Sequence, residues 1–138
     1  GYGTLAWKLR SDERVVTMER TNALHFDPPE IVDLVVIDLG WTPQALALPV
    51  AARWVKSGYL ISLIKPHYEL TNEEKREESV SKGLSDKSVE RVLDRVRETC
   101  KSLSLNIIDE TVSPVKGKKS SRKGAGNPEH LLLLQVKT

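Results

Sequence analysis

The chain has 138 residues, of which 39% are hydrophobic and 29% charged, and its formal net charge is +2. These values are typical of a soluble globular protein with a single core. No apolar run approaches the roughly 20 residues that span a bilayer, no secretion signal is visible, and a single cysteine, Cys100, excludes an internal disulfide framework. The sequence therefore predicts a cytoplasmic protein without membrane contact.

The first half of the chain predicts a strand, a second strand and a helix. Residues 14–18, RVVTM, are rich in β-branched side chains and predict a short strand. Residues 31–39, IVDLVVIDL, are almost continuously apolar, which indicates a strand covered on both faces. Thr42 and Pro43 then predict the N-cap and the first position of a helix that continues to the Ser-Gly at residues 57–58.

The second half predicts two further buried strands around a long helix. Residues 59–64 form another apolar run, whereas residues 71–85 are charged without an apolar period and predict a mobile loop or a frayed helix. Asp86 predicts the N-cap of a helix with one apolar face that reaches Leu103. Residues 105–112 and 130–136 predict the last two strands, joined by a basic loop rich in Gly, Ser and Lys.

This order of elements indicates an α/β fold. Alternating strands and helices predict a mostly parallel sheet with helices on both faces. The last two strands have no helix between them, so we expect the last strand to be antiparallel. Such a sheet is similar to that of S-adenosylmethionine-dependent methyltransferases. Ligands of open sheets bind at the carboxyl ends of the strands, where Asp38 and Lys65 lie.

Three ionisable residues next to buried strands are candidates for chemistry. Asp38 either caps the following helix or places a carboxylate at the mouth of the crevice. Lys65 either extends its ammonium to water or serves as a proton acceptor or hydrogen-bond donor to a hydroxyl, and Pro66 after it is expected to keep the chain extended. Glu129, before the run of leucines at 131–134, is either solvated or part of the same site.

A cluster of basic residues lies in the loop between the last two predicted strands. It is either a solvated loop or a contact for RNA or DNA phosphates, with nearby glycines that let the loop adapt. Its members are Lys116, Lys118, Lys119, Arg122 and Lys123. His67 and His130 lack the spacing of a metal site, so no metal is expected.

Several segments together resemble one family. GYGTLAWKLR, RVVTMERTNA, VDLVVIDLGW, LIKPHYE, SPVKG and GNPEHLLLL occur in this order. The pattern covers essentially the whole chain and is similar to that of haemolysin-A-like (TlyA-type) ribosomal RNA 2′-O-methyltransferases, which belong to the FtsJ-like group. One departure is Gly40-Trp41, where the family usually has Ser-Phe after the aspartate.

The resemblance implies transfer of a methyl group from S-adenosylmethionine to a ribose 2′-hydroxyl in ribosomal RNA. By motif, Asp38, Lys65 and Glu129 match three members of the family's Lys-Asp-Lys-Glu set. Lys65 is then the base or the orienting group, while Asp38 and Glu129 position it. The cofactor's adenosine side would meet Gly1, Tyr2, Gly3, Thr21, Asn22, Ala23 and Asp38.

The resemblance also implies that residues 1–138 are the C-terminal portion of an FtsJ-like domain. The family's first strand, its glycine-rich cofactor loop and its N-terminal RNA-binding domain precede the segment that matches Gly1. We therefore expect a Rossmann-like methyltransferase fold that lacks its first strand. Such a fragment is expected to bind the cofactor weakly, to be inactive alone and to form a homodimer through exposed strand edges.

Two other functions remain open at this point. One is a non-catalytic RNA-binding or assembly module that keeps the methyltransferase-like fold. The other is membrane lysis, which the haemolysin name suggests, although no cationic amphipathic helix or long apolar segment is visible. Ribosomal RNA or ribosomal subunits are the expected partners of the first function.

Overall fold

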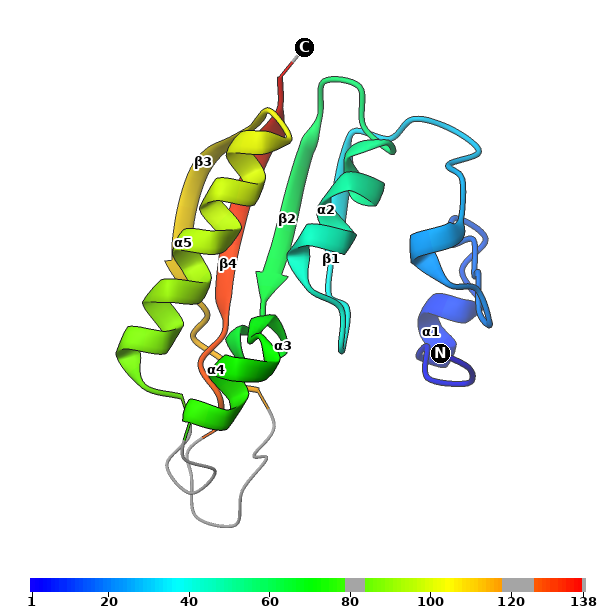
Figure 1. The fold of residues 1–138 in the computed structure, drawn as a ribbon. Helices are drawn as coiled ribbons and strands as arrows, with labels where there is room; N and C mark the ends of the chain where they lie inside the picture. Colours follow the sequence, from blue (N-terminus) through cyan, green and yellow to red (C-terminus); the bar gives the residue numbers. More distant parts are fainter. Residues whose placement is uncertain (79–83, 118–125, 138) are drawn as a thin grey trace.

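The computed structural model describes residues 1–78, 84–117 and 126–137, which contain one four-stranded sheet (Figure 1). Its strands are β1 (Leu34–Ile37), β2 (Tyr59–Ile64), β3 (Leu105–Val112) and β4 (His130–Val136). Their order across the sheet is β1-β2-β4-β3. β1 and β2 are parallel, and β4 is antiparallel to both β2 and β3. The predicted α/β class and the antiparallel last strand are confirmed, and this last strand lies inside the sheet.

The two longer helices of the described chain lie side by side on one face of the sheet. They are α2 (Gln44–Ala52) and α5 (Asp86–Ser102), which contact each other and the strands, as Figure 1 shows. Helices on both faces were expected, and this prediction is wrong for the described residues. From β1 to β2 to β3 the chain moves across the sheet in one direction. Connections between parallel strands are almost always right-handed, so two connections in the same direction place their helices on the same face.

The core fills the space between these helices and the sheet. Alternate residues of β2 and β4 face the helices and are almost fully buried, including Leu60, Ile64, Leu132 and Leu134. α5 contributes the apolar face that its sequence predicted, with Val92 fully buried. In β2 and β4, buried residues alternate with partly buried ones. One face of the sheet is therefore packed against the helices, whereas the other face is only partly covered.

The N-terminal segment contains no strand. Residues 14–18, predicted as a strand, are irregular and have no partner in the sheet. The segment contains only α1 (Trp7–Arg10) and the short 3-10 helix η1 (Ala23–His25). It is attached to α2 through the stacked rings of Phe26 and Trp54, whose centroids are 5.9 Å apart, and it lies beside the sheet in Figure 1.

Helix boundaries differ from the prediction at the caps. The Thr42 hydroxyl donates to the Gly40 carbonyl rather than capping α2, which begins at Gln44. The N-cap of α5 is Ser85, whose side chain accepts from the Ser88 N–H, and not Asp86.

The charged stretch at residues 71–85, for which a mobile loop or a frayed helix was predicted, contains a short helix. α4 (Asn72–Glu77) begins with a capping box, in which Thr71 and Glu74 each accept a hydrogen bond from the other's backbone N–H. A short helix that was not predicted, α3 (Pro66–Glu69), precedes it. Residues 79–83 lie outside the described residues.

Candidate active site

An ion pair joins the carboxyl ends of the two parallel strands. Asp38 follows the last residue of β1 and Lys65 follows the last residue of β2, so both lie at the same edge of the sheet. The Lys65 Nζ donates to the Asp38 Oδ1 at 2.6 Å, the length of a charge-assisted hydrogen bond. The Lys65 side chain is 18% exposed and that of Asp38 is 64% exposed. The lysine is therefore largely covered, whereas the carboxylate remains open to a ligand.

Glu129 lies at the same edge of the sheet but does not contact Lys65. Ile64 of β2 pairs with His130 of β4, so Lys65 and Glu129 are the next residues on these two strands. The Glu129 Oε1 lies 2.5 Å from the position that a Cβ on Gly117 would occupy, and no ion pair among the described residues joins Glu129 to Lys65. The structure thus brings Asp38 and Lys65 into contact and leaves the carboxylate of Glu129 against the loop backbone.

The exit of the chain from β2 is helical. Lys65 itself is extended, with φ −110° and ψ 94°, and Pro66 then begins α3. The prediction that Pro66 keeps the chain extended is wrong beyond Lys65, because proline is well suited to the first position of a helix. As a result, the ring of Tyr68 lies near Lys65, with its centroid 5.9 Å from Nζ.

A buried polar network fixes α3 against α2 and β2. The Glu69 carboxylate accepts the N–H of Gln44, the first residue of α2, at 2.8 Å. The Gln44 side chain accepts from the Ser62 hydroxyl at 2.6 Å and donates to the Leu63 carbonyl at 3.2 Å. Burial raises the pKa of Glu69, although the N–H of Gln44 and the charge of Arg95 oppose this rise. The network holds Ser62 and Leu63, near the end of β2, in place.

Sequence reasoning did not find this network. Gln44 and Glu69 are 25 residues apart, and neither belongs to a local pattern that predicts the contact. A signal in the sequence is that Pro43, the residue before α2, has no side-chain oxygen that could cap the helix. The first N–H groups of α2 therefore need another hydrogen-bond acceptor.

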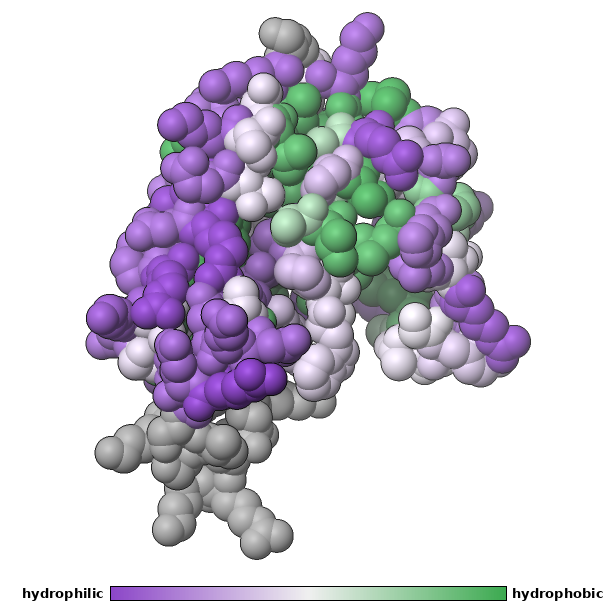
Figure 2. Space-filling view, viewed as in Figure 1, coloured by the Kyte–Doolittle hydropathy of each residue, from purple (hydrophilic) through white to green (hydrophobic). Residues whose placement is uncertain are grey.

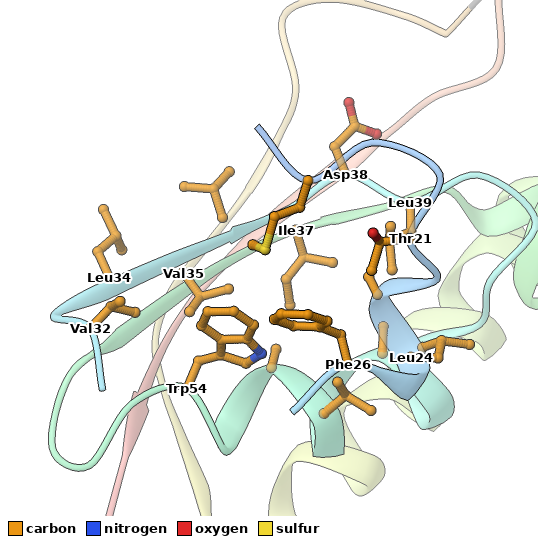
Figure 3. A pocket seen from close by; sticks show the side chains of 16 residues that line it. Thr21, Leu24, Phe26, Val32, Leu34, Val35, Ile37, Asp38, Leu39 and Trp54 are labelled. Atoms are coloured by element: carbon orange, nitrogen blue, oxygen red, sulfur yellow. The ribbon is translucent and has the colours of Figure 1, made fainter. Parts of the chain in front are cut away.

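A largely apolar cavity of about 500 Å³ lies between the N-terminal segment, β1 and α2. Figure 3 shows Val35, Ile37, Phe26 and Trp54 around it, with Asp38 at one end and its carboxylate directed away from the two aromatic rings. Side chains from both faces of β1 line the cavity, including Leu34 and Val35. It is therefore open along the free edge of β1.

Three of the predicted cofactor residues line this cavity, namely Thr21, Ala23 and Asp38. The other four do not line it and make contacts of their own within the N-terminal segment. The Gly3 N–H donates to Glu19, the Tyr2 ring lies 4.0 Å from the Arg20 guanidinium carbon, and Asn22 accepts from Leu24 at the start of η1. Gly1 accepts the N–H of Arg20.

The cavity fits one part of S-adenosylmethionine. Its apolar walls, among them Leu24, Phe26 and Leu39, can cover a nucleobase, and Asp38 supplies a negative charge at one end. The described lining residues include no Lys or Arg that could pair with the carboxylate of the methionine part. The residues present therefore fit the adenosine side of the cofactor.

Part of the predicted basic cluster can be placed beside this edge. Lys116 is exposed, and the next residue, Gly117, donates its N–H to the Asn127 carbonyl at 3.0 Å. This hydrogen bond closes the base of the loop next to Glu129. The remaining predicted members, Lys118, Lys119, Arg122 and Lys123, lie outside the described residues.

The two histidines near the edge are both covered. The Nδ1 of His67 is buried without a hydrogen-bond partner, and burial, together with the charge of Lys65, lowers the pKa of His67. His130 is buried at the start of β4. Within residues 1–78, 84–117 and 126–137, no group of three potential ligands could hold a metal ion.

Comparisons with known proteins match the whole chain to one group. It is 35% identical over 144 residues to the 16S/23S rRNA (cytidine-2′-O)-methyltransferase TlyA of Mycobacterium tuberculosis, which covers 100% of this chain and 50% of that protein. The chain is a relative of the TlyA-type proteins. Hemolysin A of Brachyspira hyodysenteriae is 28% identical over 139 residues. This match covers 95% of the present chain and 53% of Hemolysin A. The predicted resemblance is confirmed.

A solved structure supports the same relationship. A Lactococcus lactis protein provisionally named a hemolysin has a TM-score of 0.79 and 30% sequence identity, covering 96% of this chain and 62% of that structure. The chain thus spans about half to two thirds of the length of these TlyA-type relatives. No family model matches the chain. Among the described helices, none is long and apolar enough to cross a bilayer.

Proposed function

We propose that the chain contributes the catalytic edge of an S-adenosylmethionine-dependent ribosomal RNA ribose 2′-O-methyltransferase with an FtsJ-like, Rossmann-like fold. The observation that carries this proposal is the contact between Lys65 and Asp38 at the carboxyl ends of parallel strands. The name of the Mycobacterium tuberculosis relative, which is 35% identical over the whole chain, supports the general class of rRNA methyltransferase.

The ion pair has the chemistry that a ribose hydroxyl requires. S-adenosylmethionine, when bound, supplies a methyl group on a positively charged sulfur. The Lys65 Nζ lies at the mouth of the site, where its ammonium form donates a hydrogen bond that orients the attacking 2′-oxygen. To accept the hydroxyl proton, Lys65 must first release one of its own protons to solvent and act as the neutral amine. Asp38 holds the Lys65 Nζ at 2.6 Å and so fixes its direction. General base assistance of this kind contributes about 10²- to 10⁴-fold to a rate.

Glu129 is the third proposed member of the set. Its register places it beside Lys65 across the β2–β4 ladder, although its carboxylate lies against Gly117 in this structure. We therefore propose that Glu129 joins Lys65 when a substrate occupies the site.

The proposed substrate is a structured RNA, and the ligand side of the site suits it. The adenosine part of the cofactor occupies the cavity lined by Thr21, Ala23 and Asp38. Lys116 is exposed at the base of the basic loop next to Glu129. A cationic loop at this position favours the phosphates of an RNA strand whose ribose reaches Lys65.

The test is a methyl-transfer assay with the complete protein and ribosomal subunits. Methyl-labelled S-adenosylmethionine is supplied, and the RNA is then hydrolysed with alkali. A methylated 2′-oxygen cannot take part in alkaline cleavage, so the label should remain in alkali-resistant dinucleotides. Label released as mononucleotides would instead indicate base methylation. RNA binding without any transfer would leave the non-catalytic RNA-binding module as the function.

A further inference from the structure

The segment of α3 contacts the connection between β1 and α2 at three places. The three pairs are Lys65 with Asp38, Tyr68 with Trp41, and Glu69 with Gln44. The order of the residues is the same in both segments, so the two segments run side by side. The last pair fixes the far end of the connection that begins at Asp38, because Gln44 is the first residue of α2.

Glu69 is itself held in place and can therefore hold this connection. Its backbone carbonyl accepts a hydrogen bond from Arg95 of α5 at 2.8 Å, and Pro66 at the start of α3 is fully buried. The Glu69 carboxylate accepts the Gln44 N–H at 2.8 Å. The first N–H groups of a helix have no acceptor within the helix, so Glu69 takes the place of the capping side chain that Pro43 lacks.

The side chain of Gln44 ties the same point to β2. It is only 4% exposed, accepts from the fully buried Ser62 hydroxyl and donates to the Leu63 carbonyl. Gln44 is thus bound to β2 through its side chain and to α3 through its backbone. Asp38 lies between two fixed points, the end of β1 and the start of α2. The contact that holds the start of α2 therefore bears on the direction of the Asp38 carboxylate.

We propose that Glu69 is a positioning residue for methyl transfer, which acts through the contact between Asp38 and Lys65. Its hydrogen bond with Gln44 holds residues 38–43 and so keeps the Asp38 carboxylate on the ammonium group. This inference rests on the proposed function and deepens it by naming a residue that aligns the ion pair. The role requires an acceptor oxygen at the reach of a glutamate side chain and not its negative charge. A misplacement of about 1 Å at a reacting group can cost about 100-fold in rate.

Conservative variants of the complete protein separate the reach of the Glu69 side chain from its charge. Glu69→Gln keeps the length and an oxygen that accepts the Gln44 N–H, so kcat for methyl transfer to ribosomal RNA should stay close to the wild-type value. Glu69→Asp keeps the charge but is one methylene shorter, so the hydrogen bond is lost and kcat should fall by about 10- to 100-fold. The KM values for RNA and for S-adenosylmethionine should stay unchanged in both variants.

Glu110→Asp is the matched control. Glu110 is also a partly covered glutamate that accepts a hydrogen bond, from Arg97 at 2.6 Å, but it lies on β3 at the opposite edge of the sheet from β1. This variant should keep the wild-type kcat even where it lowers the midpoint of thermal unfolding. Wild-type kcat in Glu69→Asp would overturn the inference. So would a Glu69→Gln variant as slow as Glu69→Asp, since the charge rather than the reach would then matter.

Amide hydrogen exchange separates this inference from the proposed function, because the measurement needs no methyl transfer. In Glu69→Asp, the amide hydrogens of residues 38–44 should exchange faster than in the wild type and in Glu110→Asp. Faster exchange there in a protein that methylates no RNA would refute only the proposed function. Unchanged exchange there in a protein that methylates RNA would refute only the positioning role of Glu69.

Discussion

Asp38 and Lys65 differ in how much of each side chain the fold covers. Lys65 is 18% exposed and lies between β2 and α3, whereas Asp38 is 64% exposed and follows β1. An ion pair with one well-exposed partner contributes little to stability, about 0–1 kcal/mol. Substitutions in this pair should therefore change chemistry far more than folding.

The substitution Asp38→Asn tests whether the ion pair matters more for methyl transfer than for stability. It keeps the size of the side chain and removes the charge that holds the Lys65 Nζ, so methyl transfer by the complete protein should fall by about 100-fold or more. The midpoint of thermal unfolding should stay within a few degrees of the wild-type value. Asp94→Asn is the control, because Asp94 is similarly exposed, at 67%, and forms an ion pair with Arg97 within α5. Equal activity of the two variants would remove Asp38 from the mechanism.

The sequence predicted the residues of the site that follow long apolar runs. Asp38 and Lys65 each end such a run, and parallel strands bring their carboxyl ends to one edge whatever the details of packing. Glu69 could not be assigned in this way. The function of Glu69 depends on a contact with Gln44 across 25 residues, which no local pattern specifies.

At the level of elements, α4 carries a carboxylate, that of Glu74, which contacts both Thr71 and Arg95. Glu74 closes the capping box with Thr71 and forms an ion pair with Arg95 of α5, and it is only 7% exposed. Burial by itself would raise the pKa of Glu74, but the hydrogen bonds from Arg95 and Thr71 outweigh burial and lower it. Arg95 also donates to the Glu69 carbonyl at 2.8 Å, so this contact connects α4 and α5 to the helix after Lys65.

Glu74→Gln should destabilise the fold at neutral pH by about 1–3 kcal/mol, the range for a lost hydrogen bond to a charged group. Because the folded-state pKa is lower than the usual value of 4.5, the carboxylate stabilises the fold above pH 4.5 and loses this effect as the pH falls through the folded value. The difference between wild type and variant, measured by urea unfolding, should thus be largest near pH 7 and shrink in acid. Glu73→Gln, one position earlier in the same helix, is the control. A difference that persists unchanged at pH 3 would contradict this account of Glu74.

Element boundaries could be predicted from the sequence where one face of the element is buried. The prediction failed where a contact with a residue far away in the sequence determines the local structure. The predicted strands at residues 59–64, 105–112 and 130–136 are confirmed to the residue. An apolar run marks the first and the last of them. The predicted strand at 14–18 is wrong, since β-branched residues form a strand only beside another strand. The prediction for residues 71–85 left a loop and a frayed helix open, because α4 is stabilised by a capping box and by Arg95 rather than by an apolar face.

At the level of the whole molecule, the edge of the sheet formed by β1 has no partner among the described residues. Its outward side chains Leu34 and Val36 are 48% and 66% exposed. Figure 2 shows hydrophobic residues gathered over the part of the molecule around α2, whereas the surface over α4 and α5 is hydrophilic. An open, apolar strand edge favours pairing with another strand.

The predicted homodimer through strand edges remains a proposal, and the β1 edge is where it should form. Sedimentation of residues 1–138 at rising concentration should show association, and Val36→Lys should suppress it, because a charge on an edge strand opposes pairing. Leu46→Lys is the control, since Leu46 is similarly exposed, at 54%, but lies on α2. Monomers at all concentrations, or association that only Leu46→Lys suppresses, would contradict pairing at this edge.

The global arrangement was only partly accessible from the sequence. The alternation of elements predicts the α/β class, but the insertion of β4 between β2 and β3 depends on pairings between distant segments. Helices on both faces require a crossover with a helix in the opposite direction across the sheet. The step back from β3 to β4 contains no helix among the described residues. Local patterns carry no information about that direction.

The most direct test of the account is the rate of methyl transfer to ribosomal RNA by the Lys65→Ala variant of the complete protein. Lys56→Ala is measured beside it, because Lys56 is an exposed lysine close to the opposite end of β2. The account predicts that Lys65→Ala loses at least about 100-fold in kcat, while RNA affinity and thermal stability stay at wild-type values and Lys56→Ala remains fully active. Wild-type kcat in Lys65→Ala would contradict it.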